Sequence, residues 1–149
     1  MKQFRFGLDG VLDYRHQVLE GRQNEYAKAL RQVREQQERV DNAQERYQQT
    51  NCRFRELAAE GIAIADAMGF ENSLRALEQE IAREIKILQE REEQAEKQCA
   101  MVLQAHMDAS ILERLKEKQK IAYQKEVQKQ DERFIDELVS AERVGRSES

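Results

Sequence analysis

The stretch "GIAIADAMGFENSLRAL", residues 61–77, decides the fold, because it is the only good turn signal in the chain. Gly61 and Gly69 are its helix-breaking residues, and Asn72 or Ser73 is a suitable N-cap for a following helix. The sequence therefore predicts one coiled-coil domain over residues 1–149. It begins with a helix at about residues 8–60 and a turn at about residues 61–73. A second helix at about residues 73–143 and a short tail at residues 144–149 follow.

The chain on both sides of this turn has the composition of long helices. Among its 149 residues there is no Pro, there are only six Gly, and 36% are charged. A compact domain of this length normally has Pro and Gly at many turns, so their scarcity favours a few long helices. Low hydrophobicity with many charges also fits disorder. The net charge is only −4, however, and the apolar residues are periodic, which favours an ordered chain.

Apolar residues recur every seven positions through the first predicted helix. All seven positions of this row are apolar: Leu12, Leu19, Tyr26, Val33, Val40, Tyr47 and Phe54. A second row, three residues further on, is mostly polar or small: Arg15, Arg22, Ala29, Gln36, Ala43, Thr50 and Leu57. One strong and one weak row make a heptad seam that needs a partner helix to bury it.

The second predicted helix supplies that partner. Its own seven-residue row is Leu74, Ile81, Leu88, Ala95, Val102 and Ala109. Because a short connection makes consecutive helices neighbours, the sequence predicts an all-α, antiparallel two-helix coiled-coil hairpin. A turn centred near residue 66 gives the expected facing pairs: Phe54 with Leu77, Tyr47 with Ile85, and Val33 with Cys99.

The second predicted helix is longer than the first and should extend beyond it by roughly a dozen residues. This C-terminal helical overhang carries an apolar stripe: Val127, Phe134, Ile135, Leu138, Val139 and Ala141. An apolar stripe left in water is usually an interaction site. A flexible N-terminal segment is the alternative cover, because Phe4 and Phe6 are placed to pack on the overhang near Phe134.

The charge distribution argues against nucleic acid as a partner. Residues 1–60 carry 11 Lys and Arg against 10 Asp and Glu, a net charge of +1, and residues 61–149 carry 14 against 19, a net charge of −5. An acidic half beside a near-neutral half predicts no basic stripe of the kind that neutralises phosphates. Interspersed charges of both signs are more typical of a solvated helix face.

The sequence also predicts a cytoplasmic protein. Its longest apolar stretch, residues 61–70, is interrupted by Asp66 and falls far short of the roughly 20 residues that span a bilayer. The N-terminus lacks the apolar core of a signal peptide. The two cysteines, Cys52 and Cys99, fit a reducing compartment in which thiols stay unpaired.

No grouping of residues indicates catalysis, a metal or a cofactor. There is no Gly-rich phosphate loop, no triad of nucleophile, base and orienting group, and no concave scaffold that would exclude water. His16 and His106 are the only histidines and are expected to lie offset along the hairpin, on its flanks. We therefore expect neither an enzyme nor a metal protein.

Two features have a structural and a functional interpretation. Arg15 and Arg22 occupy seam positions. In the structural interpretation their aliphatic stems pack in the seam and their charges pair with Glu113 or Glu117. In the functional interpretation they leave this end of the hairpin open to a ring-shaped partner. The turn residues could fold back to cap the hairpin, or the aromatic-rich tip could bind a second partner.

The start of the chain, "FRFGLDGVLDYR" at residues 4–15, resembles the start of the flagellar FliJ family. The pattern that carries the resemblance is Phe-Arg-Phe-x-Leu-x-x-Val-Leu-x-x-Arg. "GIA" at residues 61–63, with Phe70 and "LRALEQEI" at residues 74–81, is similar to the family's hairpin and second-helix start. "ERFIDELVSAER", residues 132–143, resembles its usual ending, so the resemblance spans essentially the whole chain.

This resemblance implies a soluble, non-enzymatic component of the bacterial flagellar type III export apparatus, at the cytoplasmic face of the inner membrane. The chain would insert as a stalk into the hexameric ring of the export ATPase (FliI), touch the export gate (FlhA) and escort export chaperones. The residues expected in the ring are Leu8, Val11, Leu12, Arg15, Phe134 and Leu138. Those expected at the gate are Tyr47, Phe54, Leu74, Leu77 and Ile81. Asp9 would be the N-cap of the first helix.

Two other classes of protein share the periodic features. A structural or scaffolding coiled coil, such as a homodimeric tether, would sediment as a dimer, and a parallel dimer would be about twice as long as a hairpin. A disordered hub that folds on binding would show little helix in the isolated chain by circular dichroism.

Overall fold

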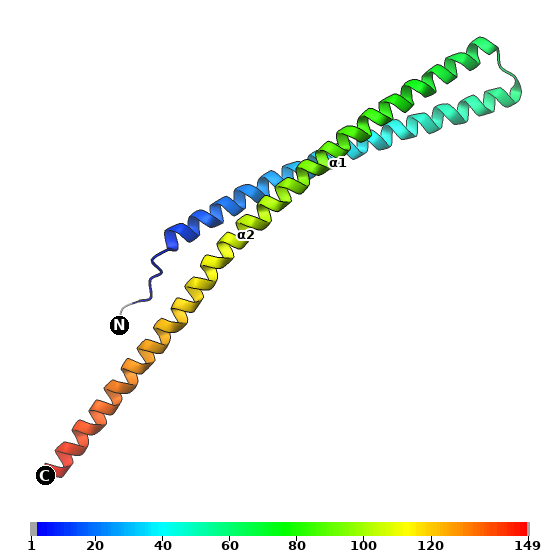
Figure 1. Ribbon diagram of the computed structural model, residues 1–149. Coiled ribbons are helices and arrows are strands. Elements are labelled where there is room, and N and C mark those ends of the chain that lie inside the picture. The colour runs from blue at the N-terminus through cyan, green and yellow to red at the C-terminus, as the bar shows by residue number, and fades with distance from the viewer. Residues whose placement is uncertain (1–2, 149) are drawn as a thin grey trace. The chain divides into compact units, whose positions relative to one another are not determined.

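The computed structural model describes residues 3–148, with side chains described for residues 3–146. It contains two helices, α1 (Asp9–Glu60) and α2 (Ile64–Glu148), and no β-strand within residues 3–148. Figure 1 shows the helices joined by a short turn. Gly61 ends α1 with a φ of 100°, a left-handed conformation that only glycine adopts without strain.

The turn is shorter than the sequence predicts. Between the two helices only residues 61–63 are non-helical, and α2 begins at Ile64 instead of near residue 73. The amide of Ala67 donates to the carbonyl of Ala63 at 3.0 Å, so the helical pattern starts before Asn72 and Ser73. Gly69 lies inside α2, where a single glycine costs about 1 kcal/mol and is tolerated. At its other end α2 continues to Glu148, beyond the predicted end near residue 143, and Ser149 lies outside the described residues.

Residues 20–103 form one compact unit, here called the tip unit. In it α1 and α2 lie side by side and run in opposite directions (Figure 1). Its buried apolar side chains are Ala29, Val40, Ala43, Leu88 and Ala95. Most of these are alanines, which let the helices approach closely, so Ala29 and Ala43 of the weak row of the α1 seam are buried because they are small. The predicted all-α antiparallel hairpin is confirmed.

Facing residues in the tip unit lie one heptad away from the predicted pairs. Phe54 packs against Phe70, with ring centroids 5.4 Å apart, instead of facing Leu77. Tyr47 donates a hydrogen bond of 3.3 Å to the carboxylate of Glu78, one heptad before Ile85. The misplaced turn is the cause, because moving the centre of an antiparallel hairpin by about half a heptad moves the facing partner by about a whole one.

The two cysteines of the tip unit are free, and the fold keeps them apart. A hydrogen bond with Cys99 raises the pKa of Tyr26, and the charge of Cys99 and burial act in the same direction. Because Cys99 faces Tyr26, Cys52 lies about 26 residues further along α1, or about 39 Å at 1.5 Å per residue. A disulfide requires Cα atoms within about 7 Å, so this geometry excludes a bridge within one chain.

A polar layer interrupts the seam near its middle. Gln36 is buried, and its side-chain amide donates to the backbone carbonyl of Glu84 at 2.9 Å and to the Glu84 carboxylate. A heptad seam tolerates slippage by seven residues, because every apolar position then meets another one. A buried polar pair that matches in one register opposes such slippage, at a cost in stability.

Replacing Gln36 by Leu is therefore expected to raise the free energy of unfolding by about 1 kcal/mol, because an apolar side chain would occupy a buried seam position. Gln37→Leu is the matched control, since Gln37 is exposed and should change stability by less than about 0.5 kcal/mol. Thermal unfolding followed by circular dichroism measures both. A loss of stability in Gln36→Leu would show that the hydrogen bonds contribute more than apolar burial there.

The described residues 3–19 and 104–148 form a second compact unit, here called the open-end unit. Phe6 and Leu12 are each only 5% exposed. Phe4 packs against Tyr123, with ring centroids 5.7 Å apart. The aromatic start of the chain thus anchors α1 on α2, but at Tyr123 and not near Phe134. The amide of Asp9 donates to the carbonyl of Phe6 at 3.2 Å, and this turn keeps the segment too short to reach further along α2.

Candidate partner-binding surfaces

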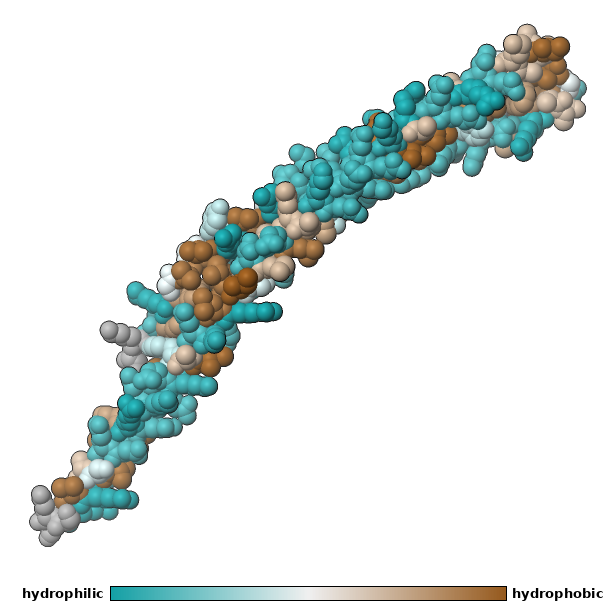
Figure 2. Space-filling model, in the orientation of Figure 1, coloured by the Kyte–Doolittle hydropathy of each residue, from teal (hydrophilic) through white to brown (hydrophobic). Residues whose placement is uncertain are grey.

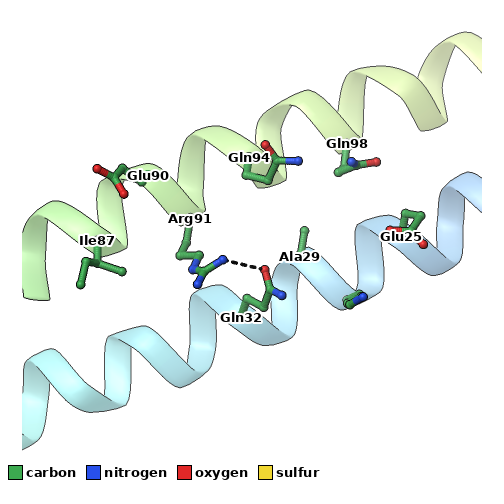
Figure 3. Close-up of a pocket in the computed structure, with 9 residues that line it drawn as sticks. Glu25, Ala29, Gln32, Ile87, Glu90, Arg91, Gln94 and Gln98 are labelled. Carbon is green, nitrogen blue, oxygen red and sulfur yellow. Dashed lines mark hydrogen bonds between the residues drawn. The ribbon is translucent and has the colours of Figure 1, made fainter.

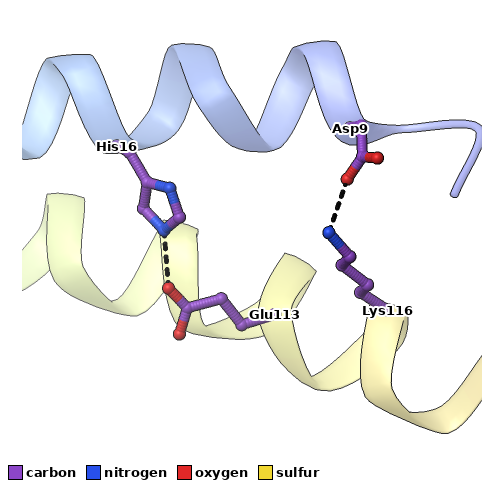
Figure 4. Close-up of polar contacts among 4 residues, drawn as sticks. All are labelled: Asp9, His16, Glu113 and Lys116. Atoms are coloured by element: carbon purple, nitrogen blue, oxygen red, sulfur yellow. Dashed lines mark hydrogen bonds and ion pairs between the residues drawn. The ribbon is translucent and has the colours of Figure 1, made fainter. Parts of the chain in front are cut away.

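Polar contacts hold the start of α1 against α2 in the open-end unit (Figure 4). Lys116 Nζ lies 2.9 Å from the carboxylate of Asp9, and His16 Nε2 lies 2.6 Å from Glu113 Oε1. The carbonyl of Leu8 accepts the first helical hydrogen bond, from the amide of Leu12, so Leu8 precedes the helix as its cap residue. Asp9 is therefore not the N-cap, and its carboxylate pairs with Lys116 across the two helices.

The pKa of Lys116 is raised, mainly by its hydrogen bond to Asp9. Burial acts in the opposite direction, while the negative charges of Asp9 and Asp13 raise the pKa further. A lysine whose pKa is raised by folding stabilises the folded chain below its ordinary pKa. That contribution is lost as the pH rises through the folded-state pKa, so the contact is fully formed near neutral pH.

The seam arginines have other partners than the sequence predicts. Arg15 lies 3.6 Å from the carboxylate of Asp108, and Glu113 is bound by His16. In the tip unit Arg22 donates to the sulfur of Met101 at 3.4 Å. The predicted pairing of these arginines with Glu113 or Glu117 is therefore wrong. Arg15 is half-buried, while Arg22 is exposed.

The six residues predicted for the ATPase ring differ in exposure. Leu8 and Val11 are exposed, whereas Leu12 is buried and acts as packing below them. On α2, Phe134 and Leu138 are 62% and 55% exposed. Ile135 and Val139 are also exposed, which makes an apolar stripe of four large side chains on one helix. Four of the six residues are therefore exposed, while Arg15 is half-buried and Leu12 is buried.

The five residues predicted for the export gate all lie half-buried along the seam near the turn: Tyr47, Phe54, Leu74, Leu77 and Ile81. The apolar side chains that project from the tip are Ile64, 80% exposed, and Met68, also exposed. Figure 2 shows apolar side chains gathered where the two helices are joined. From the sequence, Ile64 and Met68 were predicted to lie in the turn. Their spacing of four residues, which places two side chains on one face of a helix, could have indicated that they belong to a helix.

A cavity of about 660 Å³ lies beside these residues at the tip. Leu57, Ile62 and Phe70 line its apolar side, while Arg53 and Asp66 lie at its edge. Gly61 and Gly69 also line the cavity. The tip therefore offers a shallow recess with the exposed apolar side chains of Ile64 and Met68 nearby and two charges of opposite sign at its edge.

A polar groove lies further along the tip unit, beside the buried polar layer (Figure 3). Arg91 donates to the side-chain oxygen of Gln32 at 3.2 Å across the two helices, and Ala29 lies on α1 next to Gln32. The Oε1 atom of Gln98, at the same groove, is buried and has no hydrogen-bond partner among the described residues. This polar groove interrupts the apolar seam of the tip unit.

The described residues offer surfaces for partners and no metal centre. Within residues 3–148 no group of three or more His, Cys, Asp or Glu side chains is arranged to hold a metal ion. None of the described helices is long and apolar enough to cross a membrane. A pair of long antiparallel helices with exposed apolar side chains near the end of α2 and at the turn defines a protein of the two-helix coiled-coil class.

Comparison with known proteins narrows this class. Residues 4–149 match the family described as Flagellar FliJ protein, and the chain belongs to that family. No curated protein and no solved structure gives a match. Members of this family are non-enzymatic components of the flagellar export apparatus, so the chain is a component of that apparatus and serves protein transport.

Proposed function

We propose that the open-end unit inserts into the hexameric ring of the flagellar export ATPase (FliI) as a stalk. The observation that carries this proposal is the exposed apolar stripe of Phe134, Ile135, Leu138 and Val139. Side chains of this kind exposed together on one helix mark an interaction site. In a component of the export apparatus, a partner with an apolar socket is the occupant that fits a single projecting helix.

Residues at the start of α1 extend the same proposed surface. Leu8 and Val11 are exposed, and Arg15 holds Asp108 beside them. Leu12 contributes by packing, because it is buried below these residues. The proposed ring surface therefore combines the start of α1 with the projecting end of α2.

The tip is the second proposed surface, for the export gate (FlhA). Its support is the pair of exposed side chains Ile64 and Met68 beside the recess lined by Phe70. Tyr47, Phe54, Leu74, Leu77 and Ile81 contribute through their half-exposed edges and by holding the tip together. Export chaperones are the third class of partner, by family resemblance alone.

Co-purification tests the first proposal directly. The tagged full chain, expressed in a flagellated bacterium, is expected to retain the export ATPase, and the purified chain is expected to stimulate ATP hydrolysis by that enzyme. Retention of the gate without the ATPase would contradict the assignment of the open end to the ring.

Tyr47→Ala combined with Leu77→Ala is expected to weaken binding to the purified export gate by about tenfold or more, while stimulation of the ATPase stays unchanged. Ile64→Ser combined with Met68→Ser should do the same without touching the seam, since both side chains are exposed. Tyr47→Phe is the control for the hydrogen bond to Glu78, because it removes the hydroxyl and keeps the ring. Loss of both activities, or of neither, would count against a gate surface at the tip.

A further inference from the structure

A second stripe of side chains follows the open-end unit along α2. Its members are spaced three or four residues apart and so share one face of the helix: Met107, Ile111, Arg114, Lys118, Ile121, Lys125 and Lys129. All seven are exposed. From Met107 to Lys129 this outer stripe is about 33 Å long at 1.5 Å per residue. It carries four cations, three large apolar side chains and no acid.

Two of the four acids in residues 107–129 are turned toward α1. Asp108 pairs with Arg15, and Glu113 is bound by His16, so these acids of the segment are turned toward α1. Figure 4 shows Glu113 and Lys116 reaching across to the first helix. By contrast, none of the four cations of the outer stripe has an ion pair or hydrogen bond with another residue in the described part of the chain.

Charge counted over long segments hides this arrangement. Residues 114–129 carry six Lys and Arg against two Glu, a net charge of +4 inside the acidic half of the chain. The expectation that the chain has no basic stripe is therefore wrong for this segment. The sorting of charge between the two sides of α2 depends on helix geometry, which segment totals do not include.

The mixture of cations and apolar side chains along one line limits the kind of partner. A protein that covered Met107, Ile111 and Ile121 would have to bury the neighbouring cations as well, and burying a charge is costly unless it is fully paired. The headgroup layer of a bilayer keeps ammonium groups hydrated while their stems and the apolar side chains enter the acyl boundary. Clusters of Lys and Arg on such helices bind anionic lipids.

We propose that the outer stripe binds the surface of a bilayer that contains anionic phospholipids. The helix lies on the membrane and does not cross it, in keeping with the lack of a spanning helix among the described residues. This inference goes beyond the proposed binding to the ATPase and gate, and it uses none of the side chains assigned to them. Because the outer stripe belongs to the open-end unit, it concerns the chain outside the ring, and membrane binding and ring insertion are alternative states.

Vesicle flotation of the full chain tests the proposal. We expect the chain to float with vesicles of phosphatidylcholine containing 30% phosphatidylglycerol, about tenfold or more above its level with pure phosphatidylcholine, and to be released by high salt. Lys118→Glu with Lys125→Glu should lose this binding at least about tenfold. Lys86→Glu with Lys97→Glu is the matched control, because it changes the charge equally at two exposed positions of α2 outside the stripe.

Equal losses in the two variants would overturn the proposal, and so would absence of flotation with the anionic vesicles. Binding to polyglutamate but not to these vesicles would assign the stripe to an acidic protein and also overturn it. Far-UV circular dichroism checks that the variants stay helical, and Lys118→Gln with Lys125→Gln repeats the test with a smaller charge change. The vesicle test contains no ATPase, so its failure is distinguishable from a failure of the proposed ring binding, which the co-purification tests.

A fluorescent reporter gives an independent measurement, because the chain has no Trp. Ile121→Trp places a single indole in the stripe, and its emission is expected to shift to shorter wavelength on anionic vesicles. Tyr14→Trp, at an exposed position on α1, is the control and should not shift. A shift at Tyr14→Trp with none at Ile121→Trp would overturn the assignment to this face.

Discussion

Replacing Phe134 and Leu138 together by Asp is expected to weaken binding of the chain to the flagellar export ATPase by about 100-fold or more, with thermal unfolding unchanged. Both side chains are more than half exposed, so no packing within the chain is lost. Large apolar side chains near the centre of an interface carry most of its binding energy. In a complex the two introduced carboxylates would also lose their hydration without gaining a cation or hydrogen-bond donor, and this cost weakens binding further.

The control for this variant has the same change of charge on the other side of the helix. Ser140→Asp with Arg143→Ser lowers the net charge by two at positions that do not share a face with Phe134 and Leu138. Titration calorimetry with the purified ATPase compares the two. Equal weakening by both would point to charge repulsion as the cause, and unchanged affinity of the first variant would remove the apolar stripe from the interface.

Ala43→Glu is expected to lower the free energy of unfolding by about 3 kcal/mol and the melting temperature by more than about 10 °C. Ala43 is 0% exposed, in the row of small residues that lets α1 and α2 approach. A glutamate there would push the helices apart and bury a charge in the seam. The loss is a large fraction of the stability of a typical domain.

Ala27→Glu on the same helix is the matched control, because Ala27 is exposed. Its stability should change by less than about 0.5 kcal/mol. Circular dichroism at increasing temperature measures both variants. An Ala43→Glu chain as stable as the control would mean that the two helices do not pack through this row.

The heptad pattern predicted the helices and the side of α1 that is buried. From Leu12 to Phe54 all seven members of the strong row are buried or half-buried. The same pattern could not select the register, because a seam shifted by one heptad still pairs apolar positions with apolar positions. The turn decides between registers, and the sequence offered Gly61 and Gly69 as equal breakers. Only Gly61 adopts the left-handed conformation that ends a helix.

The candidate surfaces could be predicted from the sequence only where the apolar pattern alone identified them. Phe134 and Leu138 were recognisable because an apolar stripe continued past the end of the other helix. Ile64 and Met68 were missed because they were assigned to the turn. The outer stripe was missed because charge was summed over whole halves of the chain, and the net charge of +4 on residues 114–129 is hidden inside an acidic half.

Hydrogen–deuterium exchange of the full chain, with and without the export ATPase, tests the central claim most directly. In the free chain the amides of residues 128–146 should exchange fast, because that part of α2 has no helix packed against it. Addition of the ATPase is expected to slow exchange there and in residues 9–19, and to leave residues 54–77 unchanged. Slower exchange confined to residues 54–77, with residues 128–146 exchanging as fast as before, would contradict the claim that the open end enters the ring.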